Sequence, residues 1–142
     1  MNREKATRVA VLFDVWEEEA EPPPEAPPPR ARRPKKKKKK KEKHDREEIF
    51  TALQKLGYEP SYQVVDGRPQ SLTALARCEA DLVFNLVESY AGDDTKDMNM
   101  AAYLDLLERP YTGTGPHGLY LAQDKSLAKK IFAFHQIRTP FF

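Results

Sequence analysis

The sequence predicts a small α/β domain with a mostly parallel four-stranded sheet flanked by helices. The chain has 142 residues, of which 39% are apolar, and this is enough for one domain if the apolar residues cluster. They gather in residues 8–13 and 46–116, where short apolar runs alternate with segments of helical period. Such alternation is typical of right-handed βαβ units built around a parallel sheet.

The first strand is predicted at residues 8–13, because a continuous β-branched and apolar run is expected where a parallel strand is buried on both faces. A helix is predicted from about residue 45 to Gly57, a glycine that can end it. Its apolar residues recur at helical spacing: Ile49, Leu53 and Leu56.

The second strand is predicted at residues 62–65, with Asp66-Gly67 as the turn that follows it. A short helix begins after Pro69 and has an apolar face made of Leu72, Leu75 and Ala76. Residues 81–87, Asp-Leu-Val-Phe-Asn-Leu-Val, form the strongest predicted strand of the chain.

A third helix is predicted over residues 98–107, with Asp97 as its N-cap and an inward face made of Met100, Ala101, Leu104 and Leu107. Residues 110–112 form a brief fourth strand. Residues 126–136 form an amphipathic helix whose apolar face has no partner within the predicted domain, so it packs back, pairs with a second chain as a homodimer or frays.

A proline- and lysine-rich segment follows the first strand, and we expect residues 14–45 to be a disordered insertion. Seven of the twelve prolines lie in residues 17–34, and residues 30–43 carry eleven basic side chains against one acidic one. Proline removes backbone donors and like charges repel, so little can offset the entropy of ordering. Since the whole chain has a net charge of +2, the remainder of the chain is acidic. Lysine is a fair helix former, so the end of the tract can also extend the next helix backwards.

Two functional interpretations compete for the run of seven lysines in this segment. A lysine run binds nucleic acid or other polyanions through contacts that weaken with salt. It is otherwise a tolerated surface-loop insertion, since lengthening a loop costs little entropy. We favour the insertion, because the run has no interleaved aromatic residues for base stacking. The polyanion-binding candidates are Lys35, Lys36, Lys37, Lys38, Lys39, Lys40 and Lys41.

The last third of the chain carries a specific order of motifs. The strand at residues 81–86 is followed by Pro110-Tyr-Thr-Gly-Thr-Gly115, by Asp124-Lys125 and Lys129, and by Ile137-Arg-Thr-Pro140. This order resembles the N-terminal part of D-alanyl-D-alanine ligases. The resemblance implies a Rossmann-like pre-ATP-grasp domain in residues 46–122 together with the strand at 1–13, and the truncated start of the central ATP-grasp domain in residues 123–142.

The resemblance also implies an activity for the complete enzyme. Such ligases join a carboxylate to an amine through an acyl phosphate made from ATP with magnesium. Their substrates are small amino acids, and the partners expected here are the remaining ATP-grasp domains, in cis or on another chain. By resemblance Lys125 faces nucleotide phosphates, although an exposed helix lysine is the alternative interpretation. We expect no catalysis by this chain alone and no tight binding of ATP or magnesium.

The sequence departs from the family pattern in two loops. Asp14-Val-Trp-Glu-Glu-Glu stands where the family has Gly-Gly-x-Ser-x-Glu, and residues 87–97 replace its His-Gly-x-x-Gly-Glu-Asp-Gly loop. Asn85-Leu-Val-Glu88 resembles a divergent, ligase-like branch, which leaves the substrate open. Glu88 is a candidate to orient an amino group or a neighbouring loop, and a capping or solvated carboxylate is its alternative.

Other site types lack support in the residues. The single cysteine, Cys78, excludes an internal disulfide and fits a reducing, cytoplasmic setting. The three histidines lie far apart, and the acidic residues of 93–97 fit no calcium loop, so we predict no metal site. No run approaches the roughly 18 apolar residues of a membrane span.

Overall fold

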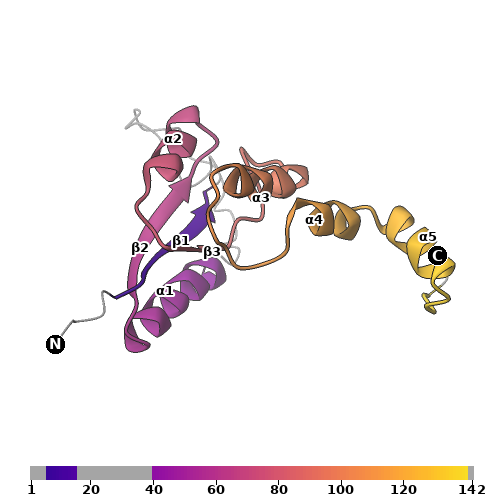
Figure 1. Ribbon diagram of the computed structural model, residues 1–142, viewed down its shortest axis with the longest axis horizontal. Helices are drawn as coiled ribbons and strands as arrows, with labels where there is room; N and C mark the ends of the chain where they lie inside the picture. The colour runs from indigo at the N-terminus through magenta and orange to yellow at the C-terminus, as the bar shows by residue number, and fades with distance from the viewer. Residues whose placement is uncertain (1–5, 16–39, 141–142) are drawn as a thin grey trace, which may run out of the picture.

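The protein folds as an α/β domain around a parallel sheet. The structure, a computed structural model, describes residues 6–15 and 40–140. Within these residues the sheet has three strands in the order β2-β1-β3, all parallel, formed by β1 (Arg8–Asp14), β2 (Glu59–Val65) and β3 (Leu82–Asn85) (Figure 1). The predicted fold class is therefore confirmed, and the predicted strand number is treated below.

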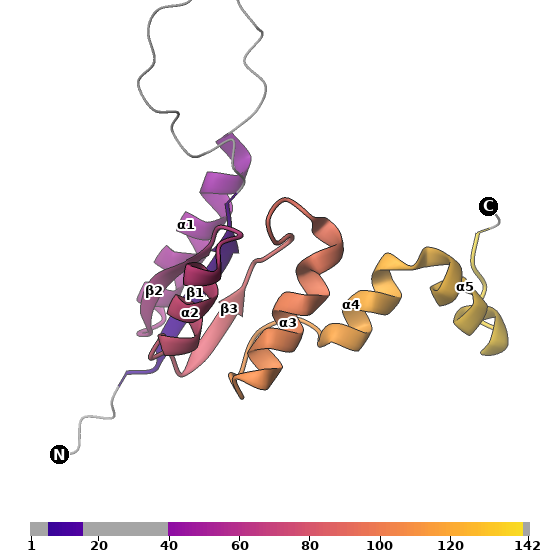
Figure 2. The same ribbon diagram turned by 90° about the horizontal axis from the view of Figure 1, so that it is seen from above.

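Strand β1 is the centre of the sheet because both of its faces are apolar. Val9 and Val11 pack with Leu53 on the side covered by helix α1 (Lys40–Lys55). Ala10 and Leu12 pack on the opposite side, in the main core with residues of α2 (Pro69–Arg77) and α3 (Asp97–Leu106). All four β1 side chains are fully buried. The layers on the two sides of the sheet are visible in Figure 2.

The predicted fourth strand at residues 110–112 is wrong as a strand, because the pairing is reduced to one bridge between Val83 and Tyr111. The Val83 N–H donates to the Pro110 carbonyl (2.8 Å), and the Thr112 N–H donates to the Val83 carbonyl (3.0 Å). The ladder stops there because the next N–H, that of Asn85, donates to the Thr112 hydroxyl (3.0 Å) instead of a backbone carbonyl.

Helix α1 begins at Lys40, earlier than the predicted start near residue 45. The expected disordered segment of residues 14–45 is therefore too long, since Asp14 is the last residue of β1. Residues 40–45 are helical, in agreement with the expectation that the end of the lysine tract can extend the helix backwards. Residues 16–39 lie outside the described residues. The predicted end of the helix is confirmed: Gly57 has φ of 85°, and the Gly57 and Tyr58 N–H groups donate to the carbonyls of Gln54 (3.0 Å) and Leu53 (3.1 Å).

The predicted inward face of α3 is confirmed, but its N-terminus differs from the prediction. Met100, Ala101 and Leu104 are buried, and Leu107 packs against the same core from just beyond the helix. Asp97 is the first helical residue and not the N-cap, because the short 3-10 helix η2 (Asp94–Lys96) runs directly into α3.

Two further helices lead away from the sheet as an arm, α4 (Pro116–Gln123) and α5 (Lys125–Phe134) (Figures 1 and 2). Helix α4 was not predicted, although Pro116 at its first turn after Gly115 is a typical start signal. On α5, Phe134 is 83% exposed. None of the helices in residues 6–15 and 40–140 combines the length and the apolar character that a membrane span requires.

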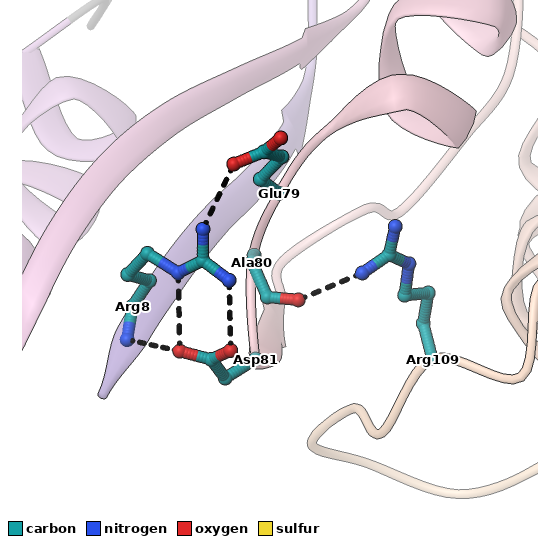
Figure 3. Close-up of polar contacts among 5 residues, drawn as sticks. All are labelled: Arg8, Glu79, Ala80, Asp81 and Arg109. Atoms are coloured by element: carbon teal, nitrogen blue, oxygen red, sulfur yellow. Dashed lines mark hydrogen bonds and ion pairs between the residues drawn. The ribbon is translucent and has the colours of Figure 1, made fainter. Parts of the chain in front are cut away.

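The amino end of the sheet is fastened by Arg8, at the start of β1 (Figure 3). Its guanidinium donates to both oxygens of Asp81 (3.0 and 3.3 Å) and to Glu79 (3.0 Å), and its backbone N–H donates to Asp81 (2.8 Å). The hydrogen bond to Asp81 raises the pKa of Arg8. Nearby, Arg109 donates to the Ala80 carbonyl (2.8 Å). These contacts fix the segment that enters β3 beside β1.

Replacing Asp81 by asparagine should lower the denaturant midpoint of unfolding, because an amide offers one acceptor where the carboxylate offers two and carries no charge for Arg8. Glu79→Gln is the matched control. The Glu79 side chain is 86% exposed and makes a single contact with Arg8, so its replacement should have a smaller effect. Urea unfolding followed by circular dichroism measures both midpoints. Equal shifts would contradict the role assigned to Asp81.

Candidate functional site at the carboxyl edge of the sheet

The carboxyl ends of the three parallel strands lie at one edge of the sheet, where open α/β sheets place their ligands. The residues that follow each strand are polar or small: Asp14 ends β1, Asp66 and Gly67 follow β2, and Glu88 lies shortly after β3. We call Asp14, together with the connections after β2 and β3, the rim. The contacts within the rim decide which side chains are held and which are presented to solvent.

Asp14 ties the end of β1 to the connection after β3. One carboxylate oxygen accepts from the Ser89 hydroxyl, and the other accepts from the Glu88 N–H (3.3 Å). Ser89 is only 2% exposed, whereas Glu88 is exposed. The backbone of Glu88 is therefore anchored while its carboxylate faces solvent.

A second set of contacts shapes the connection just before Glu88. The Asn85 side-chain oxygen accepts from the Val87 N–H (3.2 Å), and the Thr112 hydroxyl accepts from the Asn85 N–H (3.0 Å). The asparagine of the Asn85-Leu-Val-Glu88 motif thus turns the chain at the end of β3, and the threonine of the Pro110-Tyr-Thr-Gly-Thr-Gly115 motif supports that turn. Both side chains act here by accepting hydrogen bonds from backbone N–H groups.

The connection after β2 touches the connection after β3 at Gly67. A side-chain Cβ at Gly67 would lie 2.8 Å from the Ala91 Cβ and 2.9 Å from the Ala91 Cα. Gly67 also has φ of 79°, a conformation that glycine adopts at little cost. Only a glycine lets these two connections pass so closely, so all three strand ends are joined in one rim.

The acidic residues after β3 have structural contacts of their own and do not converge on one point. Asp93 accepts from the Thr95 N–H (3.0 Å) and hydroxyl (2.6 Å), and these bonds lower the pKa of Asp93, with help from Lys96. Asp97 accepts from the Gln123 amide (2.5 Å), which links α3 to α4. In the part of the chain that the structure describes, no group of three or more His, Cys, Asp or Glu side chains could hold a metal ion.

Asp66 caps the turn after β2 in the same manner as Asp93. Its carboxylate accepts from the Arg68 N–H (3.0 Å), and the pKa of Asp66 is lowered chiefly by this bond and by Ser71. Both carboxylates therefore bind their partners best when ionised. A group whose pKa is lower in the folded state stabilises the fold above its unfolded pKa of about 4.

We expect the stability of the fold to fall as the pH drops from about 5 through 4 and below, because Asp66 and Asp93 are then protonated. The variant Asp93→Asn should keep the cap but show a shallower loss of stability with acid than the unchanged chain. Thr95→Val, which removes the main cause of the lowered pKa of Asp93, should flatten the profile as well. Urea midpoints measured at intervals from pH 6 to about pH 3 test this, and an unchanged slope in both variants would contradict it.

The Pro110-Tyr-Thr-Gly-Thr-Gly115 motif links the sheet to the arm. Gly113 has φ of 108°, which permits the turn away from the sheet, and Gly115 is the N-cap of α4. The Tyr111 hydroxyl donates to Asp105 (2.9 Å). Burial, followed by this hydrogen bond, raises the pKa of Tyr111. In this structure the motif positions α4: Gly113 allows the chain to turn, and Gly115 begins the helix.

Lys125 is the first residue of α5, which follows α4 in the arm that leads away from the sheet (Figure 1). Glu88, in contrast, lies at the carboxyl edge of the sheet, shortly after β3. Asp124 caps this helix by accepting from the Leu127 N–H (2.8 Å), and Lys125 itself is exposed. One turn further on, Lys129 donates to the Pro140 carbonyl (2.6 Å). The structure thus does not bring the two predicted site residues together.

The other predicted site residues belong to the lysine run. Of these, Lys35 to Lys39 lie outside the described residues, while Lys40 and Lys41 form the first turn of α1. The sequence reasoning missed the pairing of Asp14 with Ser89. A signal was available, since Asp14 directly follows one apolar run and Ser89 lies two residues after another, and the ends of these runs meet at one edge of a parallel sheet.

Curated proteins that resemble this chain are D-alanine–D-alanine ligases. The chain is 39% identical over 90 residues to the ligase of Halalkalibacterium halodurans, covering 63% of this chain and 28% of the relative. It is 35% identical over 77 residues to that of Bordetella petrii (54% and 23%), and 31% identical over 94 residues to that of Fusobacterium nucleatum (66% and 31%). No family model matches the chain, and no solved structure gives a significant match.

The extent of these matches defines what the similarity covers. The chain spans less than a third of the length of each of these three relatives. The similarity nevertheless takes in more than half of this chain in each case. By sequence, the chain is thus similar, over more than half of its length, to one part of D-alanine–D-alanine ligases.

Proposed function

We propose that this chain is the N-terminal, substrate-side part of an ATP-dependent carboxylate–amine ligase that resembles D-alanine–D-alanine ligase, and that it is not catalytic alone. The observation that carries the proposal is the similarity to ligases more than three times as long as the matched segment. In this proposal the substrate-side domain runs through the end of β1 at Asp14 and from the start of α1 at Lys40 to residue 122, around the segment between them. Residues 123–142 begin the nucleotide-binding domain.

In a ligase of this type, ATP with magnesium would convert the carboxylate of one substrate to an acyl phosphate, from which the amine of the other substrate displaces phosphate. The described residues offer no cluster able to hold a metal ion, and Lys125 stands exposed at the start of α5. They do not fit a magnesium–nucleotide site by themselves, so we derive no step through it. Their contribution is to bind and orient one substrate.

Glu88 is the side chain that we assign to the substrate. It lies at the carboxyl edge of the sheet, it is exposed, and its backbone N–H is anchored by Asp14. A carboxylate in this position accepts hydrogen bonds from a protonated amine, the group that a small amino acid or a dipeptide presents at neutral pH. Glu88 would thus hold the amino end of the substrate and leave its carboxylate for activation.

We assign Lys125 to the nucleotide phosphates, since a flexible ammonium stabilises phosphate as a point charge. The chain alone should bind Mg-ATP only weakly, and Lys125→Ala should abolish the chemical-shift changes that millimolar Mg-ATP causes in α5. Lys130→Ala is the matched control, because Lys130 is an exposed lysine of the same helix. Equal effects of both variants would indicate attraction by charge alone and would remove Lys125 from the proposed site.

The first experiment on the proposal is the mass of the native gene product in its own cell, detected with an antibody against residues 46–122. A product at least about twice as long as this chain would have room for nucleotide-binding domains. That product, once purified, should release phosphate from ATP only when a small D-amino acid is present. A native product that ends at Phe142, or a longer one without this activity, would overturn the proposal.

A second candidate function rests on the charge of the insertion. Residues 30–43 carry eleven basic side chains against one acidic side chain, which favours contact with a polyanion by a non-catalytic binding or scaffolding protein. Binding to heparin or to a random oligonucleotide should then weaken steeply with salt, and replacing Lys35 to Lys41 by glutamine should remove it. Affinity that survives this replacement, or no affinity at low salt, would exclude this candidate.

A further inference from the structure

The rim holds one contact whose function the proposed ligase role leaves open, the hydrogen bond between the Ser89 hydroxyl and Asp14. Buried hydroxyl groups are usually satisfied by the nearest backbone carbonyl. Here Ser89 reaches across 75 positions of sequence to a carboxylate at the end of the central strand. The bond therefore joins the end of β1 to the connection after β3, two segments that are far apart in sequence.

The same carboxylate also accepts from the Glu88 N–H, so both of its oxygens are used on consecutive residues of one connection. Ser89 is buried, which excludes water as a competitor for its hydroxyl. Glu88, next to it, is exposed. Asp14 thus binds the backbone N–H of Glu88 and the side chain of its neighbour Ser89, which fixes the point of the rim from which the Glu88 side chain extends.

We infer that Asp14 is a positioning residue for Glu88, and that the Asp14–Ser89 pair holds Glu88 ready to accept a protonated amine. The inference deepens the proposed function and rests on it for the identity of the ligand. Asp14 acts without touching that ligand, because its two oxygens are engaged by Glu88 and Ser89. The close passage of Gly67 and Ala91 supports the same connection from the side of β2.

The inference predicts a local signature in the chain as it exists. In Asp14→Asn, which keeps the volume but offers a single acceptor oxygen, the hydrogen exchange of the Glu88 amide should rise by about tenfold or more. Ser89→Ala should raise it less, because Asp14 can still accept from Glu88. Asp93→Asn is the matched control, since Asp93 caps η2 within the same connection and should leave the Glu88 amide unchanged.

The ligand is tested with two probes that differ only at the amine. D-alanine at millimolar concentration should shift the Glu88 resonances of the unchanged chain, and N-acetyl-D-alanine should not, because acetylation removes the positive charge. In Asp14→Asn the shifts caused by D-alanine should be lost or at least several-fold weaker. Thermal unfolding of each variant identifies any that fail to fold, in which case Ser89→Ala supplies the comparison.

The outcomes separate the two ideas. Unchanged exchange at Glu88 in both Asp14→Asn and Ser89→Ala would overturn the positioning role, whatever the ligands do. Raised exchange with no response to D-alanine would keep Asp14 as the residue that orders Glu88 and would overturn the amine as its ligand, together with the role proposed for Glu88. Equal responses to D-alanine and N-acetyl-D-alanine would likewise exclude amine recognition.

Discussion

Replacing Leu104 by alanine is expected to lower the free energy of unfolding by about 2–5 kcal/mol, the range for removing a fully buried leucine side chain. Leu104 is 0% exposed and lies where α3 meets the sheet, within the core that also contains Leu12, Val83 and Leu75. A domain of this size is stable by only about 5–15 kcal/mol. The variant should therefore be partly unfolded at moderate temperature, with its urea midpoint shifted far to lower concentration.

Leu106, two positions further along α3, is the matched control for Leu104. It is 81% exposed, so Leu106→Ala removes the same atoms from a position that packs little and should change stability by no more than about 0.5 kcal/mol. Urea unfolding followed by circular dichroism gives both values on one scale. A difference below about 1 kcal/mol between the two variants would mean that α3 is not packed on the sheet as described.

Much of the fold could be predicted from the sequence because its strands and helices carry strong periodic signals. The continuous apolar run around Val11 predicts a central strand, and the spacing of Met100, Ala101 and Leu104 predicts the inward face of α3; both are confirmed. The residues at which strands and helices begin and end were harder to predict. The sheet ends at a single bridge to Tyr111 because the Thr112 hydroxyl takes the next N–H, a side-chain contact that no periodicity encodes.

The candidate site could be predicted less well, because it depends on contacts between distant segments. The topology alone indicates that Asp14 and Glu88 lie at the same edge of the sheet. It does not indicate that Asp14 is bound to Ser89, nor that Gly67 passes against Ala91. Those contacts depend on side-chain and loop geometry to within about an ångström. The resemblance to ligases could not place these contacts either, because the Gly-Gly-x-Ser-x-Glu motif that the family has in its first loop is missing from this chain.

Replacing Gly67 by alanine should have an effect of similar size to that of Leu104→Ala, for a different reason. A positive φ costs a residue with a Cβ about 1–2 kcal/mol, and Gly67 has φ of 79°. In addition the new Cβ would lie 2.8 Å from the Ala91 Cβ and 2.9 Å from the Ala91 Cα, so one of the two connections must move. Such overpacking typically costs a further ~1–3 kcal/mol.

Gly57→Ala separates these two terms, because Gly57 has φ of 85° but nothing within 4 Å of an added Cβ. It should lose only the conformational term of about 1–2 kcal/mol, and the excess loss in Gly67→Ala measures the contact with Ala91. Ala91 has φ of 54°, so Ala91→Gly relieves strain in either background; the contact is measured by how much more stability Ala91→Gly gains in the Gly67→Ala background than in the unchanged chain. Because Ala91 lies two residues beyond Ser89, Gly67→Ala should also disturb the resonances of Glu88, whereas Gly57→Ala should not. Equal losses in the two glycine variants, with Glu88 unchanged in both, would show that the connections after β2 and β3 move independently.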